Sequence, residues 1–314
     1  MNSRTTYKKE HLREISFPLG GMGSGCIGLA GNGSLVDWEI FNRPNKGGGN
    51  GYSHFALKAS RAGRTIDARV LCADDDTRLT GDYSHGYGEG KRASSMQGFP
   101  HFRDCVFTGE FPVARVVFED ASFPGAVSLT AFNPLIPLND SDSSIPAAFL
   151  EYAVTNTTGE PVDYTFAGTL MNPSEGSVNE FVKTRDGGAL FLRQTKYSPD
   201  ETEYCDMSLA ASGVGAVPGA EGVRVSCQEY WYRGGWNDGL ERYWRNFTEN
   251  DCLPGRSYPD PGCRDTGTLA LKLSAAPGKE ASSKTTRATG NSPVKTQSLK
   301  CGKPCIEEAR FPSP

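Results

Sequence analysis

The chain has 314 residues, of which 37% are hydrophobic and 22% charged, with a formal net charge of −4. This length permits one large domain or two ordinary ones, and the charge disfavours a nucleic-acid partner, because phosphate binding relies on clustered Lys and Arg. The 37 glycines and 20 prolines favour a turn-rich all-β chain over a helical one.

The N-terminus and the cysteines predict a cytoplasmic protein without a transmembrane span. The segment MNSRTTYKKEHLREI holds no apolar stretch of the kind that a secretory signal requires. No run approaches the ~18 apolar residues that a membrane helix needs. Nine scattered cysteines, an odd number, are typical of reduced thiols and not of a secreted disulfide framework.

Residues 1–11 form a polar lead-in, and the stretch that follows is the most unusual one in the chain. Residues 15–46 read ISFPLGGMGSGCIGLAGNGSLVDWEIFNRPNK. Glycine tolerates positive φ and lets other groups approach the backbone, so this stretch predicts a shaped surface. Residues 23–28 match the dinucleotide fingerprint G-x-G-x-x-G, which needs a helix that begins within it. Gly31 and Gly33 break a helix and no βαβ pattern follows, which argues against nucleotide binding.

Alternating apolar residues predict a series of short strands along the rest of the chain. The pattern is clearest on the two sides of the turn at 156–161, where it predicts a β-hairpin between 148–155 and 162–166. Residues 74–100 have little periodicity and predict a long loop. The other expected strands are 53–59, 65–71, 102–107, 114–119, 127–132, 189–193, 207–211, 223–227 and 269–273.

One short helix is expected near residue 240. Leu240, Tyr243, Trp244 and Phe247 follow the i, i+3, i+4, i+7 spacing of an amphipathic helix, and Asn237 or Asp238 can cap it. This pattern predicts a helix that packs its aromatic face on a sheet.

Two carboxylates in the glycine-rich stretch are candidates for chemistry. Asp37 and Glu39 would share one face of an extended segment, and a retaining glycosidase needs two carboxyl groups about 5–5.5 Å apart. Spacing along a strand does not establish that distance, and a structural role is the alternative. Trp38, Phe41 and Tyr52 are able to stack on a sugar ring or to belong to the core.

No residues predict a metal or cofactor site. His11, His54, His85 and His101 include no pair at ligand spacing, and Cys301 with Cys305 supplies two ligands where zinc needs four. Asp140 and Asp142 lack the glycine and the closing glutamate of an EF-hand and instead fit a turn rich in Asn and Asp. A G-x-S-x-G nucleophile motif is absent as well.

Three segments together resemble the N-terminal domain of glycoside hydrolase family 116, the family of the non-lysosomal glucosylceramidases and bile-acid β-glucosidases. These segments are FPLGGMGSGCIGLAGNGSLVDWEIFNRPNKGGGN…SHFALK, LTAFNPLIPLNDSDSSIPAAFLEYAVTNTTGEPVDYTFAGTLMNP and GTLALKLSAAPG. They occur in the family's order across residues 12–278.

The resemblance implies a β-sandwich followed in the family by an (α/α)₆ solenoid. The solenoid carries the nucleophilic Glu and the acid/base Asp of a retaining β-glucosidase. No position in this sequence matches those catalytic motifs, so no catalytic residue is expected here. The resemblance therefore predicts a chain that is not active alone and lacks its catalytic domain.

The pattern changes at the C-terminal end. Residues 275–314 carry seven Lys or Arg, three Glu and few large apolar side chains, a composition that predicts disorder. After Gly278 the resemblance also ends, which favours a frameshift, a mis-predicted gene end or a degenerate remnant. A sandwich over 12–275 followed by a disordered tail over 276–314 would leave an open sheet edge where the last strand is missing.

The expected architecture is therefore an all-β, two-sheet antiparallel sandwich with one short helix and a disordered C-terminal tail. Its expected function is that of an N-terminal domain in the hydrolysis of β-glucosides, with glucosylceramide-like substrates at the family level. The alternative is a non-catalytic β-sandwich that binds carbohydrate or a protein partner. The residues expected at the domain interface or at the rim of the sugar pocket are Asp37, Trp38, Glu39, Asn42 and Arg43.

Overall fold

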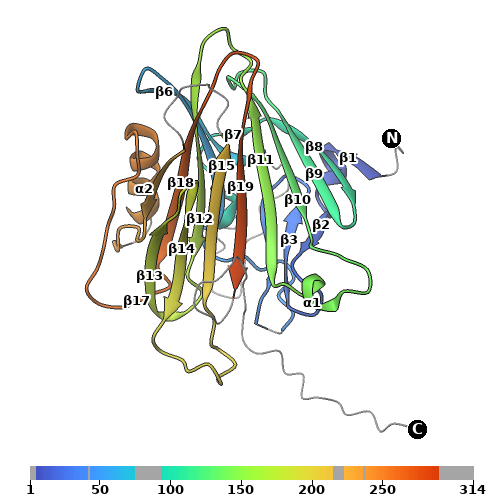
Figure 1. Ribbon diagram of the computed structural model, residues 1–314, viewed down its shortest axis with the longest axis vertical. Coiled ribbons are helices and arrows are strands. Elements are labelled where there is room, and N and C mark those ends of the chain that lie inside the picture. Colours follow the sequence, from blue (N-terminus) through green and yellow to red (C-terminus); the bar gives the residue numbers. More distant parts are fainter. Residues whose placement is uncertain (1–4, 42, 75–92, 215–222, 236–237, 290–314) are drawn as a thin grey trace.

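The computed structural model describes residues 5–41, 43–74, 93–214, 223–235 and 238–289. These residues form two large β-sheets packed face to face and one small sheet (Figure 1). The predicted all-β sandwich is therefore confirmed. Asn42, His85, most of the predicted loop 74–100 and residues 290–314 of the predicted tail lie outside the described residues.

The larger sheet has ten strands, and its neighbours pair antiparallel throughout. Its strands, in spatial order, are β1 (Thr6–Lys8), β8 (Asp104–Glu110), β9 (Val113–Glu119), β10 (Ala126–Phe132), β11 (Ala147–Thr155), β19 (Glu280–Thr289), β15 (Met207–Val214), β14 (Gly187–Gln194), β13 (Glu175–Lys183) and β17 (Gly262–Cys263).

The second sheet has six strands and the third has three. The six-stranded sheet contains β16 (Arg224–Gln228), β18 (Thr266–Ala275), β12 (Val162–Met171), β5 (His54–Arg61), β6 (Arg64–Ala73) and β7 (His101–Phe102). Its β6–β7 pair is parallel. The small sheet contains β2 (Ser16–Leu19), β3 (Cys26–Ala30) and β4 (Leu35–Glu39).

The core lies between the two large sheets. Strand β9 alternates exposed and buried residues along its whole length, which is the period of two expected for a sheet with one solvated face. Leu129, Tyr152 and Leu209 of the larger sheet belong to one apolar cluster with Leu57 and Phe166 of the six-stranded sheet. Burial of these side chains holds the layers together.

Helix α2 (Asp238–Glu249) covers the outer face of the six-stranded sheet. Tyr243 and Phe247 are buried there as the helical periodicity predicted. They pack over small residues of the sheet, which include Ala56 and Ala167. Small side chains on this face leave room for the aromatic face of the helix, so strands such as β12 are buried on both faces.

Lys58 ties the end of helix α2 to the sheet beneath it. Its ammonium group is buried and donates to the carbonyl oxygens of Phe247, at 2.8 Å, and Asn250, at 2.7 Å. These carbonyls belong to the last turn of the helix, where a cation is favoured by the helix dipole. Burial lowers the pKa of Lys58.

The predicted hairpin between 148–155 and 162–166 is wrong. Strand β11 pairs with β10 and β19 in the larger sheet, whereas β12 pairs with β5 and β18 in the six-stranded sheet. The turn at 156–161 therefore crosses from one sheet to the other. Alternation identified both strands correctly, but their apolar faces meet across the core and their edges do not pair.

The predicted boundary at residue 275 is also corrected. Strand β19 spans Glu280–Thr289 and lies between β11 and β15 inside the larger sheet. The strand expected to be missing is therefore present and leaves no open edge at this place. The sequence of β19, EASSKTTRAT, has little hydrophobic periodicity. It is held by backbone pairing on both sides and by Ala281, Ser283 and Thr285, which are buried.

Short elements complete the described chain. Strand β1 and the 3₁₀ turn Lys9–Leu12 occupy the predicted polar lead-in. A second 3₁₀ turn spans Ala93–Ser95. Helix α1 (Asp140–Ser143) is one turn long and is capped by the side chain of Asn139, which accepts from the backbone of Asp142. No helix among the described residues is long and apolar enough to cross a membrane.

Candidate functional site

The glycine-rich stretch forms the three-stranded sheet and its turns, near helix α1 (Figure 1). Two glycines permit close packing there. A Cβ at Gly21 would lie 2.4 Å from the carbonyl oxygen of Ile145, and one at Gly25, whose φ is +83°, would lie 2.6 Å from that of Glu39. Glycine is needed at both positions because any side chain would meet backbone atoms. Its described residues lead from strand to strand, and no helix that could bind a phosphate begins among them.

Asp37 lies in a β-bulge of strand β4. Gly28 pairs with Val36 and Cys26 pairs with Glu39, so one residue of β3 faces two residues of β4. Asp37 has a φ of +48° and is 7% exposed. Its carboxylate accepts from the Ser16 hydroxyl at 2.6 Å and from the Gly47 backbone N–H at 2.6 Å. These bonds tie the bulge to β2 and to the loop after β4.

Glu39 holds the same loop from its other side. Its carboxylate accepts from the Lys46 ammonium group at 3.0 Å and from the Asn45 backbone N–H at 3.2 Å. The ammonium group also lies 3.7 Å from Asp37, so both carboxylates lie close to Lys46, although the bulge at Asp37 departs from the extended segment that the sequence predicted. Hydrogen bonding from Lys46, supported by Asn45, lowers the pKa of Glu39.

The carboxylate pair is therefore arranged to shape a loop. A glycosidase acid needs a raised pKa so that it remains protonated near neutral pH. The pKa of Glu39 is shifted in the opposite direction. Both carboxylates are also bound to backbone N–H groups of residues 45–47, which is the pattern of side chains that stabilise a turn.

The other predicted site residues divide between the core and the surface. Trp38 is 2% exposed and belongs to the main apolar cluster, so it does not offer a ring to a sugar. Phe41 is half-buried, and the Arg43 guanidinium lies over its ring at 5.9 Å from the centroid. Of Asp37, Trp38, Glu39 and Arg43, Arg43 is exposed and free to meet a partner surface.

The connection 133–146 is bound to the glycine-rich turns. The side chain of Asn133 accepts from the Gly20 backbone N–H and donates to the Pro18 carbonyl, each at 2.7 Å. The Met22 backbone N–H donates to the Ser143 carbonyl at 2.8 Å. Asp142 accepts from Asn139, as the turn interpretation of this segment predicted. The two loops therefore form one rigid unit.

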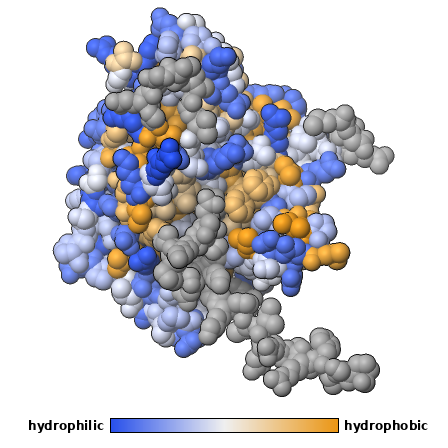
Figure 2. All heavy atoms as spheres, viewed as in Figure 1, coloured by the Kyte–Doolittle hydropathy of each residue, from blue (hydrophilic) through white to orange (hydrophobic). Residues whose placement is uncertain are grey.

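This unit presents an apolar surface, here called the apolar end surface. Met22, Phe111, Ile136 and Leu138 are about half to fully exposed, and the exposed Phe132 stacks on Phe149 with ring centroids 5.1 Å apart. Phe17 packs beside Phe111, with ring centroids 6.2 Å apart. Figure 2 shows hydrophobic surface over the ends of β10 and β11 and near α1. Exposed apolar side chains of this kind are candidates for an interaction site.

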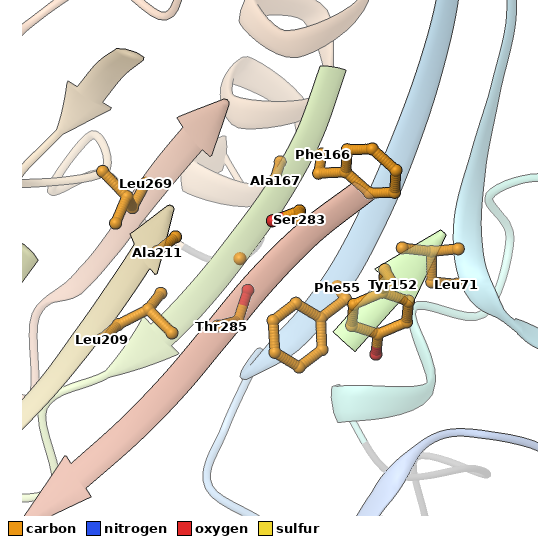
Figure 3. Close-up of a pocket in the computed structure, with 11 residues that line it drawn as sticks. Phe55, Leu71, Tyr152, Phe166, Ala167, Leu209, Ala211, Leu269, Ser283 and Thr285 are labelled. Carbon is orange, nitrogen blue, oxygen red and sulfur yellow. The ribbon is translucent and has the colours of Figure 1, made fainter. Parts of the chain in front are cut away.

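One cavity lies between the two large sheets, among the residues that the structure describes, and it is too small for a sugar. It has a volume of about 10 Å³ (Figure 3) and is lined mainly by apolar side chains such as Phe55 and Leu209, with Ser283 and Thr285 also on its wall. Such a volume admits about one water molecule, whereas ligand pockets usually measure about 300–1,000 Å³.

Two of the described histidines, His54 and His101, contact groups of the fold, whereas His11 is exposed beside Glu10. His54 is buried and contacts the Tyr52 carbonyl at 2.6 Å and the Tyr243 hydroxyl at 3.2 Å. His101 contacts the Ser95 carbonyl at 2.7 Å. Within the described ranges, no three His, Cys, Asp or Glu side chains gather in a way that would hold a metal ion.

The fold and this site define a β-sandwich domain with an exposed apolar surface. Residues 16–287 match the family model described as beta-glucosidase 2, glycosyl-hydrolase family 116 N-term. The chain belongs to this family, through its N-terminal domain. The resemblance inferred from the sequence is thereby confirmed.

Two further comparisons place the chain among known proteins. No curated protein matches the sequence. Among solved structures, the chain is similar to a putative kojibiose phosphorylase from human microbiome, with 10% sequence identity and a TM-score of 0.36. The match covers 91% of this chain and 32% of that one, so this chain spans about a third of the length of that protein.

Sequence reasoning missed two parts of the site. Nothing in the sequence except its place at the end of the glycine-rich stretch indicated that Lys46 would bind both carboxylates. The apolar end surface did leave a signal, because Ile136 and Leu138 are apolar residues inside a turn rich in Pro, Asn and Asp. Apolar side chains that occur in such a turn without strand periodicity are candidates for an exposed surface.

Proposed function

We propose that this chain is the non-catalytic N-terminal domain of a glycosidase that hydrolyses β-glucosides, with glucosylceramide-like lipids as one substrate class. In this proposal, catalysis resides in an (α/α)₆ domain, which the β-sandwich contacts. The observation that carries it is the apolar end surface, built on loops that are braced by Asn133 and by the backbone bond from Met22. A surface of that kind fits a large, stable partner better than a small ligand.

The apolar end surface and the exposed loop at Arg43 would together contact the catalytic domain. Leu138 is fully exposed and has a φ of +66°, so its side chain is displayed by a strained turn. Arg43 would supply a polar contact at the edge of the apolar area, where interfaces are usually polar. The loop that carries Arg43 would be held in place by the less exposed residues of β4, which are Asp37, Trp38 and Glu39.

A binding measurement tests this proposal. The purified chain, mixed with the separately purified (α/α)₆ domain of a family 116 β-glucosidase, should form a complex in sedimentation velocity. Leu138→Glu should weaken that complex at least tenfold, because a charge would be buried at the interface. Ile66→Glu is the matched control, since Ile66 is exposed on β6 and lies outside the apolar end surface. Equal weakening by both variants would contradict the proposal.

The absence of catalysis is tested on the chain alone. No turnover of an aryl β-glucoside is expected, because the two carboxylates of the glycine-rich stretch are bound to Lys46. Turnover that disappears in Glu39→Gln would instead assign catalysis to this pair.

A second candidate function is a carbohydrate-binding β-sandwich. The exposed rings of Phe111 and Phe132 favour it, because aromatic faces pack against the CH groups of sugars. Calorimetry with millimolar β-glucoside decides between the two. Saturable binding that is lost in Phe111→Ala supports this candidate, and the absence of binding removes it.

We also propose that the chain resides in the cytoplasm. Its scattered cysteines support this location, and Cys105 is a buried thiol whose pKa is raised by burial to about 12. A thiol of this kind is inert as a nucleophile and suits a structural core. Microscopy of a fluorescent fusion tests the location, and a signal confined to the secretory pathway would contradict it.

A further inference from the structure

A cluster of tyrosines and arginines lies where helix α2 begins, on a different part of the fold from the apolar end surface. Tyr232 is exposed and precedes the helix. The guanidinium carbon of Arg242 lies 4.0 Å from the centre of the Tyr232 ring, and that of Arg256 lies 5.5 Å from it. Two positive groups are thus gathered on one aromatic ring.

The neighbouring Arg233 has a structural role, because its guanidinium is fully engaged by other residues of the fold. Its guanidinium lies 4.2 Å from the centre of the Tyr258 ring. It donates to both carboxylate oxygens of Asp265, at 2.8 Å each, and to the Asp260 carbonyl at 3.0 Å. Ser177 donates to the same carboxylate at 2.6 Å. Its charge is balanced and its donors are used.

Arg242 and Arg256 have no such partners among the described residues. Neither guanidinium has a carboxylate within 4.0 Å, and Asp238, one turn before Arg242, does not pair with it. The Nη1 atom of Arg256 is buried and has no acceptor in the described part of the chain. A buried donor without an acceptor costs free energy, and two like charges on one ring repel each other unless an anion is present.

The surroundings leave room for such an anion. Gly235 precedes the helix and Gly255 precedes Arg256, and a Cβ at either position would meet nothing within 4 Å. Open space therefore lies beside both glycines, next to the segments that carry Tyr232 and Arg256. Guanidinium groups present forked N–H donors that match the oxygens of phosphate and sulfate. Tyr232 is exposed and adds an aromatic side chain beside the two guanidinium groups.

We propose that Arg242, Arg256 and Tyr232 form a binding site for a ligand that carries a phosphate or sulfate group. In this site the half-buried Arg256 guanidinium donates to one oxygen of the anion, and the exposed Arg242 guanidinium donates to another. This assignment stands apart from the proposed role of the domain in glycoside hydrolysis, because it uses none of the residues of the apolar end surface.

Calorimetric titration of the full chain with inorganic phosphate and with sulfate, at constant ionic strength in chloride, tests the site. Saturable binding in the millimolar range is expected. Arg242→Gln and Arg256→Gln should each weaken it about tenfold, because each removes charge-assisted hydrogen bonds. Arg245→Gln is the control, since Arg245 is an exposed arginine of the same helix that pairs with Glu241. It should bind as the wild type does.

Two further arms keep the test decisive. If Arg256→Gln fails to fold, Arg242→Gln still tests the site, because Arg242 is exposed. A hexose monophosphate that binds more tightly than phosphate, with the gain lost in Tyr232→Ala, identifies a sugar phosphate as the source of the anion, and equal binding identifies the free anion. Two results would overturn the proposal. One is a loss of binding in Arg245→Gln as large as in Arg242→Gln. The other is the absence of saturable heat up to an anion concentration of about 50 mM, which is on the order of the dissociation constants of the weakest specific sites.

Discussion

Asp37 shapes the glycine-rich stretch by combining an unusual backbone conformation with a buried charge. Its φ of +48° is rare for any residue except Gly, Asn and Asp. The carboxylate accepts from Ser16 and Gly47 and lies near the Lys46 ammonium group. One side chain therefore joins strand β2, the bulge in β4 and the loop that carries Arg43.

Substitution of Asp37 separates these contributions. Asp37→Ala should lower the free energy of unfolding by about 3 kcal/mol, because it removes charge-assisted bonds and places a β-carbon without a polar group at positive φ. Asp37→Asn should cost only about 1 kcal/mol, since Asn tolerates this conformation and its oxygen still accepts. Urea denaturation measures both values. Equal values for the two variants would show that neither backbone conformation nor hydrogen bonding is important here.

At the scale of elements, β19 is the strand on which the larger sheet depends. It pairs with β11 over Ala147–Thr155 and with β15 over Met207–Val214. Its removal would expose two strand edges in the middle of the sheet and uncover the buried side chains beneath. The six-stranded sheet would remain paired but would lose part of the layer that it packs against.

Two truncations test the position of the domain boundary. A chain that ends at Gly278 lacks β19 and should be insoluble or unfolded by circular dichroism. A chain that ends at Thr289 retains β19 and should melt within a few degrees of the full chain, in keeping with the disorder predicted for the later residues. A soluble, folded chain that ends at Gly278 would restore the boundary near 275 that the sequence predicted.

At the scale of the whole molecule, buried phenols determine how stability depends on alkaline pH. Burial raises the pKa of Tyr164 from 10.0 to about 12, against a smaller lowering effect of Arg61. The pKa of Tyr204 is also raised to about 12, mainly by burial and then by the hydrogen bond to Asp206. In the unfolded chain these phenols ionise from pH 10 upward. Their contribution to stability is therefore complete below pH 10 and is lost as pH rises to 12.

The expected result is a fall in the free energy of unfolding between pH 10 and 12. Tyr164 alone should account for about 2 kcal/mol of it by proton linkage. The lowered pKa of Lys58 acts with the opposite sign, because its unfolded form binds the proton more tightly. The comparison of wild type with Tyr164→Phe isolates the phenol, and the variant should lose less stability over this range. Parallel curves for the two proteins would contradict the assignment.

The sequence by itself determined the class of fold, most strands and the helix. Strands such as β9 and helices such as α2 have periodic patterns, because each element buries one face. The family followed from ordered segments over most of the chain, and the family match over residues 16–287 confirmed it. Asp37 and Glu39 were also identified as neighbours, since the distance along the chain is short.

Only the tertiary structure decided which strands pair and what the candidate residues do. The segments on either side of 156–161 look like a hairpin locally, yet they belong to different sheets because their apolar faces meet across the core. Strand β19 lacks periodicity and is placed by its two neighbours. Trp38 became a core residue and Lys46 a loop anchor because a bulge redirects the backbone at Asp37. Contacts between distant segments determine such outcomes, and local patterns carry no record of them.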